Sequence, residues 1–335
     1  MPPFGATVLD ATGHRLSADE KAFFRDVRPF GFIVFARNID TPDQLRALCH
    51  DMREAAGHEA VITIDQEGGR VQRMRRPAWR DWLPPLDLVQ KAGDRAPQAA
   101  YAMYRLIADE LAAVGIDSNC APLLDVALPE THAFLRNRCY GEDARQVAVI
   151  GRAVADGLLA GGVLPVMKHL PGHGRATLDS HHDLPRVAAP RTDLEAVDFA
   201  PFKQLNDLPM AMTAHLVYDA LDNCPATLSP TVMRVIREEI GFDNLIMTDD
   251  ISMKALPHAP ADSARAAIAA GCDAVLYCNA PLHDRAKVAE AAGEMTPAAQ
   301  IRAHRALAAR RAPEDVDIAA LEAQLGALLG GDAHG

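Results

Sequence analysis

Residues 164–174, Leu-Pro-Val-Met-Lys-His-Leu-Pro-Gly-His-Gly, combine the two features that decide the fold. Leu164–Met167 is a short apolar run with the length of a buried strand. Lys168 and His169 follow at once, so polar, chemically active side chains stand where the strand ends. Parallel strands buried on both faces have this apolar character, and α/β barrels carry their chemistry at the carboxyl ends of such strands.

The same alternation recurs along the whole chain, where short apolar runs are separated by amphipathic stretches with helical periodicity. The predicted strands are Ala6–Leu9, Gly31–Phe35, Ala60–Ile64, Ile116–Cys120, Leu164–Met167, Met210–Thr213, Leu245–Thr248 and Ala274–Tyr277. The predicted helices include Gln44–Ala55, Pro97–Val114, Ala144–Leu159, Thr231–Ile240 and Ser263–Ala270. Ser229-Pro230 has the pattern of an N-cap followed by proline at the first helical position, and Gly271 stands where a glycine ends a helix.

Eight predicted strands, most of them followed by a helix, favour an α/β (β/α)8 TIM barrel. The alternative is a doubly wound open sheet, but no G-x-G-x-x-G follows the first strand. From about residue 281 the sequence is Ala-rich with no further strand candidate. We therefore predict a single domain over residues 1–335, with the barrel at about 5–295 and a helical tail at about 296–335.

Composition narrows the function classes. The 335 residues carry 34 Lys and Arg against 45 Asp and Glu, and a net charge of −11 disfavours binding to nucleic acid. No apolar run approaches the roughly 20 residues of a membrane span, and the N-terminus lacks the pattern of a secretory signal. Six cysteines are scattered without a C-x-x-C pair, which is typical of reduced thiols. The expected location is the cytoplasm.

A first polar cluster follows the predicted strand Ala60–Ile64, in the sequence Asp65-Gln66-Glu67-Gly68-Gly69-Arg70. A carboxylate that emerges from a buried strand next to paired glycines suits recognition of a hydroxylated ligand, because glycines let the backbone approach closely. We interpret Asp65 as functional, and Glu67 and Arg70 as a structural ion pair.

A second, richer cluster begins at the end of Leu164–Met167. Its members are five ionisable side chains within 15 positions, namely Lys168, His169, His173, Asp179 and His181. Asp179 and His181 are two residues apart, so in an extended segment the carboxylate can orient the imidazole and raise its basicity. This pair is predicted to supply a general acid. His173 and His182 are interpreted as structural or as loop-positioning residues.

Metal binding is the alternative interpretation of this cluster, since His-rich strand ends also build the metal sites of hydrolases. The sequence has no H-E-x-x-H and no His-x-His at an early strand end, so the metal site is the less favoured hypothesis.

A third cluster, Asp249-Asp250, follows the strand Leu245–Thr248. Adjacent strand residues point to opposite sides, so only one of the two can readily face a pocket. The other is placed to cap a short helix beginning near Ile251. Spacing leaves open which residue does which. Lesser candidates, each of which could equally make ordinary loop contacts, are Asn119, Asp125, Arg136, Arg138 and His215.

Together these segments resemble the motifs of bacterial β-N-acetylhexosaminidases in glycoside hydrolase family 3. The matching stretches are DQEGGRVQR at 65–73, KHLPGHGRATLDSHHDLP at 168–185, MTDDISM at 247–253 and NCAPLLDV at 119–126, which is similar to the family's N-x-A-P-x-x-D-V. The resemblance runs in register from about Gly5 to Asn279 and is closest to the short, single-domain, cytoplasmic members.

The resemblance implies a retaining exo-glycosidase that removes terminal β-linked N-acetylglucosamine. Its implied substrates are muropeptide fragments taken up for peptidoglycan recycling, such as the disaccharide with anhydro-N-acetylmuramic acid. It implies a saccharide as the partner molecule, and no nucleic acid, membrane, protein partner, metal or organic cofactor.

The resemblance also assigns roles to individual residues. Asp249 would be the nucleophile, His181 the acid/base and Asp179 the residue that orients His181. The residues that would line the sugar pocket are Asp65, Arg73, Arg138, Lys168 and His169. The sequence departs from the family around Arg138, where Arg-Asn-Arg-Cys-Tyr stands at 136–140 and relatives often carry a Gly-Asp-Arg-Ser-Phe-like sequence.

Other activities fit the same residues. A β-glucosidase or an N-acetylglucosaminide phosphorylase would use the same fold, and a metal-dependent amidohydrolase would use the His-rich loop as ligands. A catalytically inactive sugar-binding protein is disfavoured because Asp179, His181 and Asp249 are all present.

Overall fold

The computed structural model describes residues 2–178 and 184–330 of the chain. The main sheet contains one strand for every strand predicted from the sequence. These strands are β1 (Gly5–Leu9), β2 (Pro29–Val34), β3 (Val61–Ile64), β6 (Ser118–Asn119), β7 (Leu164–Leu170), β9 (Met210–Thr213), β11 (Leu245–Asp250) and β12 (Ala274–Tyr277). All neighbouring pairs are parallel, in the order β3-β2-β1-β12-β11-β9-β7-β6.

The two end strands of this order, β3 and β6, meet and close the sheet into a barrel. The Asp117 backbone N–H donates to the Ile62 carbonyl at 3.2 Å, and the Cys120 N–H donates to the Ile64 carbonyl at 2.8 Å. The predicted TIM barrel is therefore confirmed. Every residue of β1, β2, β3, β9 and β12 is buried, which explains why these strands are continuous apolar runs in the sequence.

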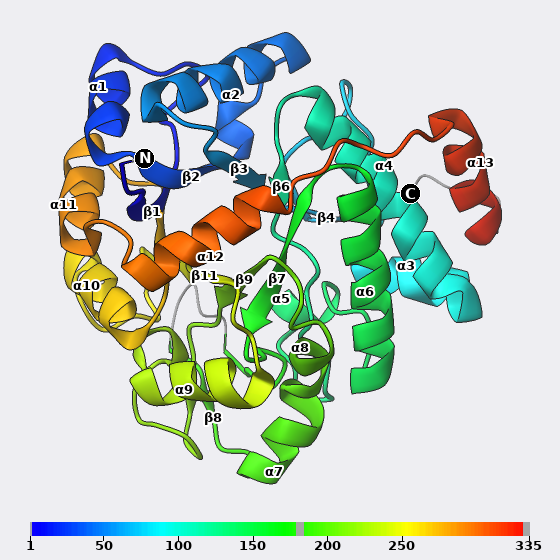
Figure 1. Cartoon of the computed structure of the whole chain (residues 1–335). Coiled ribbons are helices and arrows are strands. Elements are labelled where there is room, and N and C mark those ends of the chain that lie inside the picture. The colour runs from blue at the N-terminus through cyan, green and yellow to red at the C-terminus, as the bar shows by residue number, and fades with distance from the viewer. Residues whose placement is uncertain (1, 179–183, 331–335) are drawn as a thin grey trace.

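Helices cover the outside of the barrel (Figure 1). The longer ones are α1 (Ala18–Val27), α2 (Pro42–Ala56), α3 (Pro85–Ala92), α4 (Ala96–Ala113), α6 (Ala144–Ala160), α10 (Pro260–Ala270), α11 (Leu282–Ala292), α12 (Pro297–Ala308) and α13 (Ile318–Leu328). The short ones are α5 (Ala133–Arg136), α7 (Arg191–Asp193), α8 (Ala200–Gln204) and α9 (Pro230–Arg234).

Both predicted helix-end signals are confirmed. The Ser229 hydroxyl accepts a hydrogen bond from the Val232 N–H at the start of α9, whose first residue is Pro230. This helix continues to residue 240 as a π-helical segment, Val235–Ile240. Gly271 ends α10 with φ of 118°, a backbone conformation that favours glycine.

Three strands differ in length from their predictions by two residues or more. The predicted strand Ile116–Cys120 is reduced to β6, and the Asn119 side chain pairs with the backbone N–H and C=O of Gln66. In contrast, β7 and β11 extend through the polar residues that follow their apolar runs. Leu170 pairs with Thr213, and Asp250 pairs with Leu276, so the first polar residues of two clusters lie on the strands themselves.

Two small sheets, which the sequence did not predict, lie in the loops beyond the barrel strands. One pairs β4 (Gln66–Gly68) with β5 (Val71–Gln72), and the other pairs β8 (Arg186–Val187) with β10 (Val217–Tyr218). The first follows β3 and carries part of the 65–73 motif, so it gives that loop a defined backbone.

The predicted helical tail is present, and α12 lies across the amino-terminal end of the barrel (Figure 1). Arg302 in α12 donates to Asp243 at 2.7 Å and to Asp273 at 3.1 Å, which precede β11 and β12. Helix α12 therefore lies at the opposite end of the barrel from the polar clusters. Helix α13 packs on α4. Within the described part of the chain, no helix combines the length and apolarity that crossing a membrane requires.

Candidate active site

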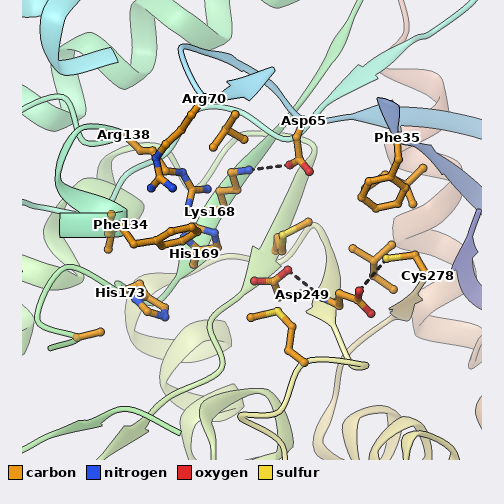
Figure 2. Close-up of a pocket in the computed structure, with 18 of the residues that line it drawn as sticks. Phe35, Asp65, Arg70, Phe134, Arg138, Lys168, His169, His173, Asp249 and Cys278 are labelled. Carbon is orange, nitrogen blue, oxygen red and sulfur yellow. Dashed lines mark hydrogen bonds and ion pairs between the residues drawn. The ribbon is translucent and has the colours of Figure 1, made fainter. Parts of the chain in front are cut away.

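The carboxyl ends of the barrel strands surround a cavity of about 400 Å³ (Figure 2). Strand β3 leads into Asp65, β7 carries Lys168 and His169 near its end, and β11 carries Asp249. The other basic side chains of the cavity wall come from the loops after β3, β6 and β7, and they are Arg70, Arg73, His132, Arg138 and His173.

Two carboxylates and three cations form a network on one side of this cavity. The Lys168 Nζ atom lies 3.0 Å from Asp65 Oδ1 and 2.5 Å from Glu67 Oε1. Arg138 donates to both Glu67 oxygens, at 2.8 and 2.7 Å. Arg73 donates to Asp65 Oδ2 at 2.8 Å. Glu67 and Lys168 are almost completely buried, so the network is rigid where it meets the cavity.

Electrostatics keep both carboxylates ionised. Burial acts to raise the pKa of Glu67, but the Arg138 and Lys168 cations outweigh it and lower that pKa to about 2. For Asp65, burial is likewise outweighed by Lys168 and Arg73, which hold its pKa well below the usual range. A lysine ammonium has three N–H donors, so Lys168 keeps one for a ligand after pairing with the two carboxylates.

The structural interpretation of Glu67 is correct, but its predicted partner is wrong. Glu67 pairs with Arg138, whereas the Arg70 guanidinium lies over the Phe134 ring, 4.1 Å from its centroid. Arg138 lies 71 positions from Glu67 in the chain, so local sequence could not identify the pair.

Asp249 and Asp250 divide their roles at the end of β11. The Asp250 carboxylate accepts from the Ser252 N–H at 3.0 Å and from the Cys278 thiol at 2.8 Å. Asp249 Oδ1 accepts from the Asp250 N–H at 2.8 Å. Asp250 therefore caps the following segment, which consists of turns rather than the predicted short helix. Contrary to the expectation that only one would face the pocket, both side chains reach the cavity wall.

Asp249 is the less restrained carboxylate and lines the cavity (Figure 2). Burial acts to raise its pKa, but electrostatic interactions with His169 and His215 and the hydrogen bond from the Asp250 N–H lower it overall. An ionised carboxylate in this position can stabilise positive charge or attack a ligand atom.

Two histidines of the 168–174 segment meet beside the cavity. The His169 Nδ1 atom lies 2.7 Å from Asp125 Oδ2, and the His173 ring packs edge-on against His169 with centroids 5.6 Å apart. His173 was interpreted as structural, and the structure places its ring in the cavity wall.

We expect His173 to make folding stability depend on pH. Burial, and then the electrostatic interaction with His169, lower the pKa of His173 from 6.5 to about 4. Between these values the unfolded chain binds a proton that the folded chain does not, so stability falls as the pH falls, by up to about 3 kcal/mol. Urea unfolding of His173→Gln should show a flatter pH dependence in this window, whereas His14→Gln, at an exposed position, should behave like wild type. An identical slope in His173→Gln and wild type would contradict the prediction.

The segment that leads from His173 towards Asp179 is tightly packed at its start. The His173 N–H donates to Asp125 Oδ1 at 2.6 Å, and Arg175 Nε lies 2.7 Å from Asp198 Oδ2. A Cβ on Gly174 would lie 2.0 Å from the Val126 carbonyl, so this glycine is required by a close backbone approach. The segment therefore leaves β7 in one defined direction.

Most of the remaining cavity wall is apolar, apart from Asn279. The apolar side chains come from strand ends and from the loops that follow them, and they are Ile33, Phe35, Val71, Phe134, Leu135, Ala176, Leu178, Met212, Met253 and Leu276. A cavity lined by both charged hydrogen-bonding groups and apolar groups suits a sugar, which has hydroxyls at its edge and apolar C–H faces.

The structure thus brings together six of the residues predicted for the site. All six line the one cavity, and they are Asp65, Arg73, Arg138, Lys168, His169 and Asp249. Asp179 and His181 lie outside the described residues. Among residues 2–178 and 184–330, no three His, Cys, Asp or Glu side chains gather as a metal-binding group.

Sequence reasoning missed Phe35 and Cys278 and treated Asp125 only as a lesser candidate. Both residues line the cavity. Phe35 directly follows β2, and Cys278 directly follows β12. Position at a strand end was therefore a usable signal for both, but an apolar ring and a thiol lack the charge that marked the other candidates.

Comparison with known proteins agrees with this geometry. The family model described as the N-terminal domain of glycosyl hydrolase family 3 matches residues 7–308. A β-hexosaminidase of Bordetella parapertussis is 37% identical over 331 residues, which cover 95% of this chain and 91% of the relative. One from Alkalilimnicola ehrlichii is 38% identical over 286 residues, covering 83% of this chain and 81% of the relative.

Solved structures show the same architecture. Native NagZ from Neisseria gonorrhoeae superimposes with a TM-score of 0.85 at 30% identity, over 99% of this chain and 97% of the other. NagZ from the same organism in complex with N-trifluoroacetyl-D-glucosamine has a TM-score of 0.84, also at 30% identity, over 99% of this chain and 98% of the other.

Proposed function

The chain belongs to glycosyl hydrolase family 3 and is a β-N-acetylhexosaminidase, and on this premise we propose that it releases terminal β-N-acetylglucosamine with retention of configuration. The proposal rests on one observation: Asp249 is an ionised carboxylate at the end of β11 and lines the cavity. The same cavity is lined by Asp65, Lys168 and Arg73.

The first chemical step needs a nucleophile at the anomeric carbon. Glycoside cleavage passes through an oxocarbenium-like transition state, which an anion stabilises. An Asp249 oxygen forms a bond to C1 while the bond from C1 to the leaving oxygen breaks. The leaving oxygen takes the bond's electron pair together with a proton from the acid. The lowered pKa of Asp249 supports this role, because the attacking group must be ionised.

His181 is proposed as the acid that supplies this proton, with Asp179 orienting its ring. In the second step, water attacks C1 and gives its proton to His181, and Asp249 is released. Retaining glycosidases usually use two carboxylates about 5–5.5 Å apart, so a His–Asp pair departs from the usual pattern. Support comes from the sequence motif D-S-H at 179–181 and from the fixed direction in which the preceding segment leaves β7.

The proposed sugar-binding residues are Asp65, Arg73, Arg138, Lys168 and His169. Asp65 and the remaining Lys168 donor suit adjacent sugar hydroxyls, since one accepts and the other donates. The glucosamine derivative bound by the Neisseria protein supports an N-acylated sugar as the ligand class.

The proposed substrates are muropeptide fragments such as N-acetylglucosaminyl-anhydro-N-acetylmuramic acid, and the proposed role is peptidoglycan recycling in the cytoplasm. Support comes from the motifs at 65–73, 168–185 and 247–253, which resemble those of the single-domain cytoplasmic members of the family.

A trapping experiment tests the proposal as a whole. A 5-fluoro N-acetylglucosaminide should inactivate the enzyme with time, and peptide mapping should place the label on Asp249. Labelling at another residue, or no covalent adduct with turnover intact, would contradict the assigned mechanism. Turnover with and without phosphate separates hydrolysis from phosphorolysis, and a chromogenic glucoside tests the β-glucosidase alternative.

His181→Ala is expected to separate substrates by their leaving groups. An activated aryl glycoside needs little protonation of the departing oxygen, so its bond cleavage should be spared, whereas cleavage of natural disaccharides should fall by about 10²- to 10⁴-fold. Parallel measurement of kcat/KM on both substrate types checks this expectation. A uniform loss across leaving groups would count against the acid role.

A further inference from the structure

We infer that Asp125 is a positioning residue for catalysis. It holds the His169 ring so that the Nδ1 proton points to the Asp125 carboxylate and the Nε2 atom is available to the sugar. The inference rests on the proposed function, because it assigns a task to a residue of the proposed sugar site.

One carboxylate makes three contacts with the segment that carries His169. Asp125 Oδ2 lies 2.7 Å from His169 Nδ1. Its Oδ1 accepts from the His169 N–H at 3.2 Å and from the His173 N–H at 2.6 Å. Asp125 itself is completely buried, in the loop after β6. The ring and the backbone on either side of it are therefore held by the same side chain.

These contacts determine which nitrogen of the His169 ring carries the proton. Burial acts to raise the pKa of Asp125, but the interactions with His169 and His173, including their hydrogen bonds, lower it overall, so the group is a carboxylate and can only accept. His169 Nδ1 must then be the donor. Since the ring lines the cavity, Nε2 is the nitrogen left for a substrate hydroxyl.

Among residues 2–178 and 184–330, other titratable groups also face the His169 ring, and none of them is placed to fix its orientation as Asp125 does. They are His173 from the loop after β7, His215 from the segment after β9, and Asp249 from β11, beside the adjacent Lys168. His215 is bound elsewhere, with Nδ1 2.7 Å from the Thr227 hydroxyl and Nε2 3.1 Å from the Asp250 carbonyl.

Asp125→Asn isolates the contact between Oδ2 and Nδ1. The two backbone N–H donors of His169 and His173 select the amide oxygen for the Oδ1 position, so the amide nitrogen must face the ring. An amide nitrogen donates, so His169 Nδ1 must accept, and the proton of the neutral ring moves to Nε2. Packing and the backbone contacts are retained, while the ring presents the wrong nitrogen to the sugar.

Kinetics and spectroscopy together test the inference. We expect kcat/KM for an N-acetylglucosaminide to fall by about 10- to 100-fold in Asp125→Asn, as is usual for a group that orients a ligand-binding histidine. In a His169→Gln background, the same substitution should change kcat/KM by less than about twofold, because groups that act through one another are not additive. ¹⁵N NMR of labelled histidines, with His169 assigned by its absence from His169→Gln, should show the proton on Nδ1 in the wild type and on Nε2 in Asp125→Asn.

Asp273→Asn is the matched control. Asp273 is also buried and accepts a backbone N–H, from Ile246 at 2.8 Å, but it lies at the opposite end of the barrel. This variant should lose thermal stability while its kinetic constants stay near wild type.

Two outcomes would overturn the inference: an unchanged tautomer in Asp125→Asn, or equal losses of kcat/KM in the wild-type and His169→Gln backgrounds. Failure of the proposed function would look different, since the wild type itself would then release no N-acetylglucosamine.

Discussion

Asp249→Ala is expected to lower kcat for an N-acetylglucosaminide by about 10⁴-fold or more, because it removes the carboxylate proposed to form the bond to C1. Binding should be much less affected, since the opposite wall, with Asp65, Lys168 and Arg73, is unchanged. Steady-state kinetics, together with calorimetric binding of N-acetylglucosamine, measures the two effects separately.

The adjacent aspartate provides the control for this prediction. Asp250→Ala removes the contacts to Ser252 and Cys278 but keeps the backbone N–H that donates to Asp249. It should therefore mainly lower stability and retain most of the turnover. Comparable activity of Asp249→Ala and the wild type would refute the nucleophile assignment, and a larger loss in Asp250→Ala than in Asp249→Ala would reverse it.

Glu67→Ala is expected to be the most destabilising single substitution in the site, by about 3–5 kcal/mol, because removing one member of a buried ion pair leaves its partners uncompensated. Arg138 would lose both of its short hydrogen bonds to Glu67, and Lys168 would keep only Asp65. Chemical unfolding monitored by circular dichroism gives the change in the free energy of unfolding.

An exposed pair of the same chemical type is the matched control. Glu142 pairs with Arg136, but both side chains are more than a third exposed, at 62% and 37%. Glu142→Ala should cost at most about 1 kcal/mol, because solvent screens the interaction. Equal losses in Glu67→Ala and Glu142→Ala would show that burial of the Glu67 network contributes nothing.

Much of the fold could be predicted because its signal is local. The strands Met210–Thr213 and Ala274–Tyr277 have the predicted bounds, since a strand buried on both faces must be apolar throughout. The strand Leu164–Met167 was predicted too short, because a local pattern cannot show that Leu170, beyond the polar residues Lys168 and His169, pairs with Thr213 of a neighbouring strand.

The location of the site followed from the same logic, but its contacts did not. Asp65, Lys168 and Asp249 each stand at a strand end, so the barrel topology alone places them at one end of the molecule. Which carboxylate pairs with which cation depends on side chains 71 and 103 positions apart. For that reason Glu67 was assigned the wrong arginine, and Asp125 could not be distinguished from an ordinary loop residue.

The amino-acid sequence by itself therefore determined the barrel and the set of reactive side chains, because apolar periodicity and the residue that follows each strand are local properties of the chain. Only the tertiary structure decided the partners: that Arg138 and Lys168 share Glu67, that Asp250 caps a turn and supports Asp249, and that Asp125 orients His169. Such pairings depend on barrel closure and loop packing, which bring distant segments within hydrogen-bonding distance.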